Sequence, residues 1–126
     1  MVCLSSNSVR CVSFKPDNRN VVVSASWDKT IKTFDITSGS CLSTLKVDNM
    51  AMSLSYAPSG DILAVGDFGG NIHFFNAKGE KALSPVRGHS DVVASVCFSS
   101  DGKKLTSGSA DSTARNWNPA TRASLS

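Results

Sequence analysis

The sequence lacks any long apolar run. A membrane-spanning helix needs about 18 consecutive apolar side chains, and no stretch of the 126 residues approaches that length. Residues 1–7 contain neither a basic region nor an apolar core, so we expect no secretion signal. Blocks of like charge are absent as well. The net charge of +3 is spread along the chain, which argues against a dedicated tail for binding polyanions.

Cysteine is scarce, and the four thiols form no recognisable pattern. Cys3, Cys11, Cys41 and Cys97 include no Cys-x-x-Cys pair and no histidine at zinc-site spacing. A disulfide framework would also need closer or more regular spacing. We expect free thiols that serve as small strand residues in a reducing compartment, which places the chain in the cytoplasm or the nucleus.

Motifs that carry chemistry are missing too. The sequence contains no phosphate-binding glycine loop, no cluster of metal ligands and no pair of carboxylates at catalytic spacing. His73 is expected to be an ordinary strand residue, since nothing around it supports a metal role. We therefore expect no enzyme, no cofactor and no metal site. The composition, 40% hydrophobic and 18% charged, is that of a globular protein of one domain.

What the chain does contain is one pattern repeated three times. Each copy has an apolar run that ends in an aromatic residue before a turn, at 12–17, 54–60 and 96–102. The aromatics Phe14, Tyr56 and Phe98 follow one another at intervals of 42 residues. A second aromatic closes each copy, at Phe34, Phe75 and Trp117, with intervals of 41 and 42 residues. A period in the low forties with strand patterning is typical of β-propeller blades.

Side-chain alternation predicts four strands in each copy. In the first strand of each copy, apolar residues alternate with small or polar ones, as in a strand with one buried face. Turn-forming pairs follow at 17–18, 59–60 and 101–102, and second strands at 21–23, 62–65 and 105–106. Third strands are predicted at 30–34, 71–75 and 113–117, and weaker fourth strands at 41–45, 82–83 and 123–125. Since helical periodicity is absent, the chain is predicted to be all-β.

The third copy carries a recognisable family signature. Its marks occur in this order: Gly88-His89, Phe98 to Gly102, Ser107, Asp111 and Trp117-Asn118. This pattern resembles the WD-repeat family, in which Trp-Asp usually stands at the closing position. The resemblance extends from about Val9 to about Leu125. It implies a single β-propeller segment over 1–126, built from about three four-stranded antiparallel blades at about 5–46, 47–87 and 88–126.

The resemblance also implies a hydrogen-bonded chain of four side chains in the third copy: His89, Ser107, Asp111 and Trp117. An indole donor, a hydroxyl, an imidazole and a carboxylate can satisfy one another. A catalytic Ser-His-Asp interpretation is disfavoured, because no nucleophile-elbow motif is present. The other copies cannot build the full chain, since the first has Phe34 in place of Trp and the second has Val65, Gly69 and Phe75 at the corresponding places. We expect those two blades to depend on apolar packing.

A rigid propeller presents loops on two faces, where binding residues gather. The resemblance therefore implies a non-catalytic scaffold or adaptor that binds other proteins within a multiprotein complex. Trp27 and Phe68 occupy equivalent turns between second and third strands, which makes them candidate partner-binding residues. Each could instead cover its own turn or pack against the next blade. The alternative function is a WD-repeat component of a ribonucleoprotein or ribosome-associated assembly that contacts RNA.

The number of blades is low for a closed ring. Propellers have about four to eight blades, and an open stack exposes the outer faces of its first and last sheets. Either missing repeats complete the ring, or two copies associate as a homodimer of six blades. Because strand patterning begins by Val9 and still continues at Leu125, we favour a chain that is part of a longer propeller.

Overall fold

The computed structural model describes residues 9–47, 49–76 and 81–119. Within these ranges the chain forms eleven strands and no helix, so the all-β prediction is confirmed. In chain order the strands are β1 (Val9–Lys15), β2 (Asn18–Ser26), β3 (Thr30–Asp35), β4 (Cys41–Lys46), β5 (Ala51–Tyr56), β6 (Ile62–Asp67), β7 (Asn71–Asn76), β8 (Lys81–Arg87), β9 (Val93–Phe98), β10 (Leu105–Ser109) and β11 (Ala114–Trp117).

The strands assemble into three antiparallel sheets. Their strand orders are β1-β2-β3-β4, β5-β6-β7-β8 and β11-β10-β9, and we name these sheets blade 1, blade 2 and blade 3. Within each sheet, consecutive strands pair with one another, because short turns such as 16–17 and 68–70 reverse the backbone. The fourth strand predicted for blade 3, at 123–125, lies outside the described residues.

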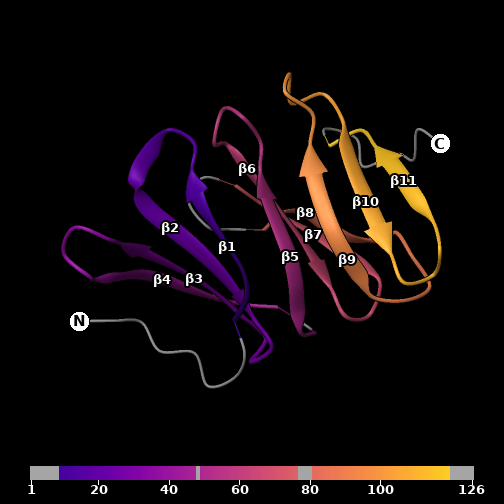
Figure 1. The fold of residues 1–126 in the computed structure, drawn as a ribbon, viewed down its shortest axis with the longest axis horizontal. Helices are drawn as coiled ribbons and strands as arrows, with labels where there is room; N and C mark the ends of the chain where they lie inside the picture. Colours follow the sequence, from indigo (N-terminus) through magenta and orange to yellow (C-terminus); the bar gives the residue numbers. More distant parts are fainter. Residues whose placement is uncertain (1–8, 48, 77–80, 120–126) are drawn as a thin grey trace.

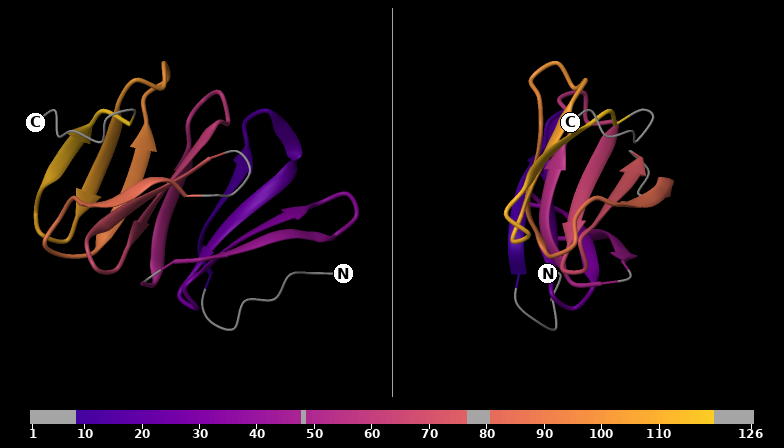
Figure 2. Two further views of the ribbon diagram at one scale, coloured as in Figure 1. Left: turned by 180° about the vertical axis from the view of Figure 1, so that it is seen from behind. Right: turned by 90° about the vertical axis from the view of Figure 1, so that its right-hand side faces the viewer.

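The first strand of each blade lies beside its counterpart in the neighbouring blade. Strands β1, β5 and β9 stand next to one another, and the later strands of each blade spread outward from them (Figure 1). Figure 2 shows the same fan of sheets from behind and from the side. Successive sheets therefore pack face to face, as blades do around a propeller axis.

Two apolar cores hold the blades together. The core between blades 1 and 2 consists of Val23, Ala25, Ile31, Val47, Ala51, Leu54, Leu63, Val65 and Phe75. The core between blades 2 and 3 consists of Ala57, Ala64, Ile72, Phe74, Val93, Val96, Phe98, Leu105 and Trp117. Adjacent residues of β7 point to opposite cores, since Phe75 belongs to the first and Phe74 to the second. Each such buried ring stabilises the fold by about 1.5–3 kcal/mol.

The two end faces of the stack differ in chemistry. On blade 1, Val12 and Phe14 are 61% and 58% exposed, whereas the equivalent Leu54 of blade 2 is buried against blade 1. On blade 3, the outward face carries small and polar side chains, and the Thr106 hydroxyl donates a hydrogen bond to Asn116 Oδ1 at 2.7 Å. The exposed apolar end face is therefore that of blade 1.

One cysteine departs from the expected free thiols. Cys41 is disulfide-bonded, whereas Cys11 and Cys97 are free, and Cys3 lies outside the described residues. The prediction failed because disulfide formation depends on how close two thiols lie in the folded chain, not on their spacing in the sequence. No helix that is long and apolar enough to cross a bilayer occurs in 9–47, 49–76 or 81–119.

Candidate functional site

Most polar residues singled out by the sequence lie at one end of the blades. This end, which we name the turn end, carries the β2–β3, β4–β5, β6–β7, β8–β9 and β10–β11 connections. The β2–β3 and β6–β7 turns lie at the lower edge of Figure 1. The meander of each sheet returns the chain to this end after every second strand. Side chains that are about 20 or 40 residues apart in the sequence can therefore meet there.

Blade 3 joins His89, Ser107, Asp111 and Trp117 in one network that begins at the turn end. Trp117 Nε1 donates to Ser107 Oγ at 2.9 Å, and Ser107 Oγ lies 2.7 Å from His89 Nε2. On the other side of the ring, His89 Nδ1 lies 2.9 Å from Asp111 Oδ2. Four elements contribute these side chains: the β8–β9 connection, strand β10, the turn between β10 and β11, and strand β11.

One arrangement of protons satisfies every member of this network. The Ser107 hydroxyl accepts the indole proton and donates its own to His89 Nε2, so the neutral imidazole carries its proton on Nδ1 and donates to Asp111. The hydrogen bond from the Thr113 hydroxyl, followed by those from the Ser90 amide and His89, outweighs burial and holds the pKa of Asp111 well below its ordinary value. Asp111 is therefore an ionised acceptor at neutral pH.

The same geometry speaks against a catalytic triad. Ser107 is fully buried, and its hydroxyl is engaged by both Trp117 and His89. A nucleophile has to reach a substrate, and this oxygen has no route to one. Trp117 is also a member of the core between blades 2 and 3, so the network joins the turn end to that core.

Blade 2 contains a buried polar pair that its motif positions do not reveal. His73 Nε2 lies 2.7 Å from Asp67 Oδ2, and the two side chains are 2% and 0% exposed. Asp67 Oδ1 accepts hydrogen bonds from the amides of Gly69 and Asn71, each at 2.9 Å. His73 Nδ1 finds no partner in the described part of the chain. His73 is thus not an ordinary strand residue, and blade 2 does not depend on apolar packing alone.

The signal for this pair was present but weak. In the repeat, Asp67 aligns with Ser109 and His73 aligns with Arg115, and neither position belongs to the family signature. The period of two along a strand does place His73 on the same buried face as Phe75. A buried histidine needs a partner, so that alternation could have prompted a search for an acid near the β6–β7 turn.

Changing Asp67 to asparagine is expected to remove a contribution to the free energy of unfolding that depends on pH in the acid range. Burial alone would raise the pKa of Asp67, but hydrogen bonds from His73 and the Asn71 amide hold it below its ordinary value. Such a carboxylate stabilises the fold above its unfolded pKa of about 3.9 and loses that contribution as the pH falls through the folded pKa. The gap in unfolding free energy between wild type and Asp67→Asn should therefore shrink below about pH 4. Urea denaturation across this range measures it, and a gap independent of pH would contradict the assignment.

The candidate partner-binding residues differ in exposure. Trp27 packs against the next blade, since its indole N–H donates to Met52 Sδ at 2.9 Å, and the Arg10 guanidinium lies 5.0 Å from the centre of its ring. Phe68, in the equivalent turn of blade 2, is 44% exposed. Arg10 is exposed and makes no ion pair with any described residue. The turn end thus displays an arginine held in place on a fixed indole, and a second aromatic in the neighbouring turn.

Comparisons with known proteins agree with this geometry. The WD40 family profile, described as "WD domain, G-beta repeat", matches residues 2–35 and 80–118. Ribosome biogenesis protein YTM1 of Pyricularia oryzae is 34% identical over 123 residues, which cover 93% of this chain and 25% of that protein. U3 small nucleolar RNA-associated protein 21 of Saccharomyces cerevisiae is 41% identical over 66 residues, or 52% of this chain and 7% of that protein. The chain thus spans a quarter or less of these relatives.

A solved structure shows the same architecture. The crystal structure of the RRP9 WD40 repeats matches with a TM-score of 0.91 at 24% identity, over 99% of this chain and 39% of that one. At this level of identity the likeness concerns the fold, and it confirms the predicted propeller class. The two profile matches together cover more than half of the sequence and include the third copy with its network residues. The chain belongs to the WD40 repeat family of β-propeller proteins.

Proposed function

We propose that this chain is a non-catalytic scaffold segment that binds proteins within a ribonucleoprotein assembly of ribosome biogenesis, in the nucleus. The observation that carries the proposal is the 34% identity to a ribosome biogenesis protein over 93% of the chain. The second relative is named for its association with a small nucleolar RNA, which supports the same setting. The two names refer to ribosome biogenesis and to a small nucleolar RNA, so we propose that the scaffold acts beside RNA even where its own contacts are with protein.

The chemistry of the turn end favours protein as the direct partner. Tryptophan and arginine are the residues that contribute most often to binding energy at protein interfaces, and Trp27 and Arg10 are already held in one arrangement. Holding them in place lowers the entropy lost on binding. Phe68 adds an exposed ring in the neighbouring turn. An apolar centre flanked by the Arg10 guanidinium suits a protein surface.

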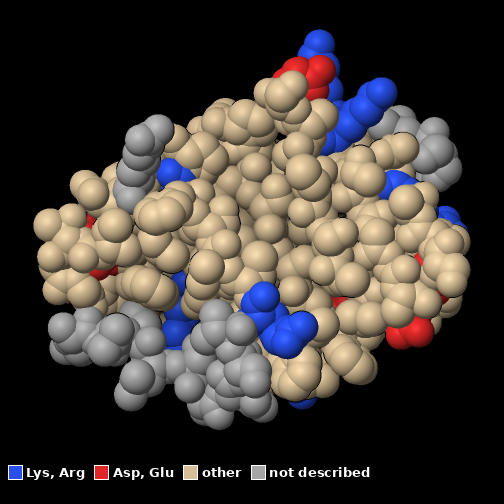
Figure 3. Space-filling view, in the orientation of Figure 1, with Lys and Arg blue, Asp and Glu red and all other residues tan. Residues whose placement is uncertain are grey.

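The charge distribution gives less support to direct RNA binding. In Figure 3, Lys and Arg side chains are scattered over the visible face, with no continuous basic patch among the atoms drawn in colour. Sequence-independent binding of RNA depends on several phosphate contacts from neighbouring cations. Direct RNA contact is therefore the second candidate function, and salt dependence separates the two.

An affinity purification from nuclear extract tests the proposal. Wild-type chain is expected to recover ribosome-assembly proteins at low and high salt and after ribonuclease treatment. Trp27→Ala and Phe68→Ala should each reduce that recovery by about tenfold, because both remove a ring from the turn end. Circular dichroism of the purified variants shows whether they remain folded.

The matched control is Ile36→Ala. Ile36 is 50% exposed, like Phe68, but it follows β3 at the opposite end of blade 1. Its removal should leave recovery unchanged. If wild type and Trp27→Ala instead recover the same RNA, and high salt removes it steeply, direct RNA contact replaces protein binding as the function.

A further inference from the structure

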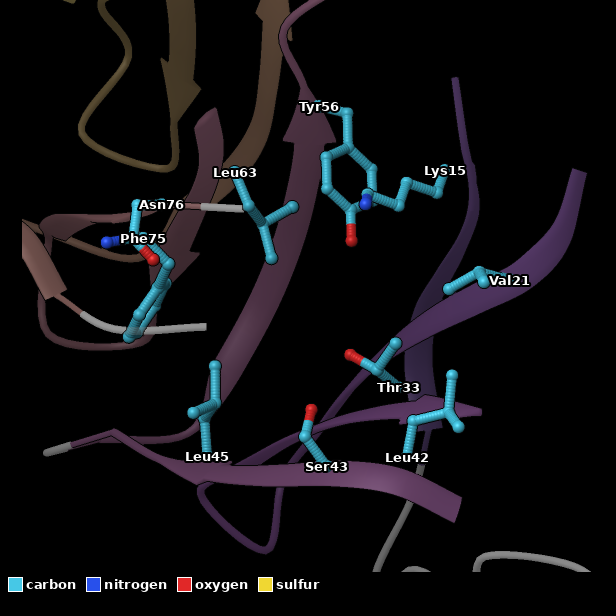
Figure 4. Close-up of a pocket in the computed structure, with 10 residues that line it drawn as sticks. All are labelled: Lys15, Val21, Thr33, Leu42, Ser43, Leu45, Tyr56, Leu63, Phe75 and Asn76. Atoms are coloured by element: carbon cyan, nitrogen blue, oxygen red, sulfur yellow. The ribbon is translucent and has the colours of Figure 1, made fainter. Parts of the chain in front are cut away.

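A cavity of about 210 Å³ opens between blades 1 and 2. Figure 4 shows its lining, which comes from β1 to β4 on one side and from β5 to β7 on the other. Its residues include the last of β1, β5 and β7, namely Lys15, Tyr56 and Asn76, so it lies toward the end opposite the turn end. The cavity is therefore separate from the Trp27 surface.

Half of the residues that line the cavity are apolar, and part of that apolar wall is fixed. Val21, Leu42 and Leu45 contribute from blade 1, and Leu63 and Phe75 contribute from blade 2. Leu63 and Phe75 belong to the core between the two blades, so packing holds the inner wall of the cavity in place. Leu42 is 54% exposed, so the outer lip is open. An apolar group entering from outside would be desolvated against a preformed surface.

Two hydrogen-bond donors face the same cavity. The Lys15 and Tyr56 side chains both line the cavity, from β1 and β5, and both are labelled in Figure 4. Burial, with the nearby Asp17 carboxylate, raises the pKa of Tyr56, so the hydroxyl keeps its proton at neutral pH. Lys15 lies 3.5 Å from Asp17, which occupies one of its three donors and leaves the others for a ligand. The remaining Lys15 donors and the Tyr56 hydroxyl can bind a carboxylate, although the Asp17 carboxylate offsets part of the Lys15 charge.

The lip of the cavity is an edge strand. β4 is the outermost strand of blade 1, and no described strand pairs with its outer edge. Leu42, Ser43 and Leu45 of this strand line the cavity. An exposed edge offers a row of backbone donors and acceptors to an extended peptide, while an adjacent pocket selects one of the peptide's side chains.

The size of the cavity identifies its occupant. Sites for whole small molecules measure about 300–1,000 Å³, whereas a cavity of about 150 Å³ already holds benzene. We propose that the cavity receives one leucine- or phenylalanine-sized side chain of an extended protein segment that pairs with β4. An acidic residue of the same segment binds the Lys15 ammonium and the Tyr56 hydroxyl. The proposal stands apart from the ribosomal setting, since any partner with such a segment fits it.

Dye-labelled peptides test the pocket directly, with fluorescence anisotropy on the 126-residue chain. The probe is a short peptide of alternating threonine and valine with a central Leu-Glu pair. Replacing its leucine with alanine should weaken binding by about 10- to 100-fold, because the buried side chain is lost. Replacing its glutamate with lysine should weaken binding by about 3- to 10-fold, since like charges then meet at Lys15. Equal binding of all three peptides would overturn the proposal.

Variants of the chain complete the test. Ser43→Trp fills the cavity from the edge strand, and Tyr56→Phe removes one donor without changing the shape. Binding should fall by about tenfold or more in the first and about threefold in the second. Lys103→Glu, at an exposed turn of blade 3, is the charge control and should bind as wild type does. Unchanged affinity in Ser43→Trp, or no binding by the wild-type chain, would refute the pocket. Trp27→Ala should leave peptide binding intact, so the two proposals fail independently.

Discussion

Replacing Ser107 with alanine is expected to lower the free energy of unfolding by about 2–4 kcal/mol. The hydroxyl is fully buried and holds both the Trp117 indole and the His89 imidazole, at 2.9 and 2.7 Å. Without it, two buried nitrogens lose a partner at once, and each orphaned group costs about 1–3 kcal/mol. Alanine differs from serine by one oxygen, so no large cavity complicates the result. Urea denaturation with linear extrapolation measures the loss.

Ser24 supplies the matched control for this experiment. It occupies the same place in blade 1 and is also buried, but its blade has Phe34 instead of tryptophan. No hydrogen bond of its side chain occurs within the described part of the chain. Ser24→Ala should therefore change the unfolding free energy by less than about 0.5–1 kcal/mol. Equal losses in the two variants would mean that the network of blade 3 contributes no stability of its own.

Gly70→Ala is expected to have the largest effect, a loss of about 3–5 kcal/mol. Gly70 has a φ of 89°, and an added Cβ would lie 2.2 Å from the His89 carbonyl oxygen. Backbone atoms cannot rotate away as a side chain can. The Gly70 carbonyl also accepts the amides of Gly88 and His89, both at 3.0 Å, so any shift displaces the first residue of the network. Denaturation of the purified variant measures the loss.

A second glycine separates the collision from the backbone strain. Gly102 has a φ of 73°, similar to that of Gly70, but the nearest atom to its added Cβ is Pro58 Cδ at 3.4 Å. Gly102→Ala should therefore lower the free energy of unfolding only by the strain of a left-handed alanine, about 1–2 kcal/mol. If both variants lose the same stability, the close approach of the β6–β7 turn to the β8–β9 connection does not constrain the fold as the structure indicates.

The sequence repeat predicts most strand positions closely. The predicted third strands at 30–34 and 71–75 correspond to β3 and β7, because apolar alternation with an aromatic end is a strong local signal. The fourth strand of blade 2 was underestimated, at 82–83 instead of β8 (Lys81–Arg87). Pro85 interrupts the pattern, and only an edge strand tolerates a proline, since its outer side needs no ladder partner.

Contacts between side chains and between blades were harder to predict than strands. The network of blade 3 was inferred from a family signature, whereas the Asp67–His73 pair occupies positions that the signature leaves free. The stacking of Arg10 on Trp27 depends on the register that opposes Val9 to Ser26, and a sequence does not fix such a register through an irregular pairing. The cavity between blades 1 and 2 depends on how far two sheets diverge. No local pattern encodes that angle.

The hydrogen-bond network of blade 3 anchors two loops to the core, which suits a scaffold. It fixes the β8–β9 connection and the β10–β11 turn through hydrogen bonds that end on Trp117, a member of the core between blades 2 and 3. Loops anchored in this way lose little entropy when a partner binds them. Rigid display of loops, rather than chemistry at Ser107, is the use that the geometry supports.

Cross-linking of lysines within the intact assembly tests the scaffold role most directly. Lys29 is exposed in the β2–β3 turn, two residues after Trp27, whereas Lys103 is exposed in the β9–β10 turn at the other end. Binding of proteins at the turn end predicts that Lys29 cross-links to other protein chains and that Lys103 does so rarely. If Lys29 cross-links to no other protein, while ultraviolet light cross-links RNA to the turn containing Trp27, the proposal that proteins bind at this end is contradicted.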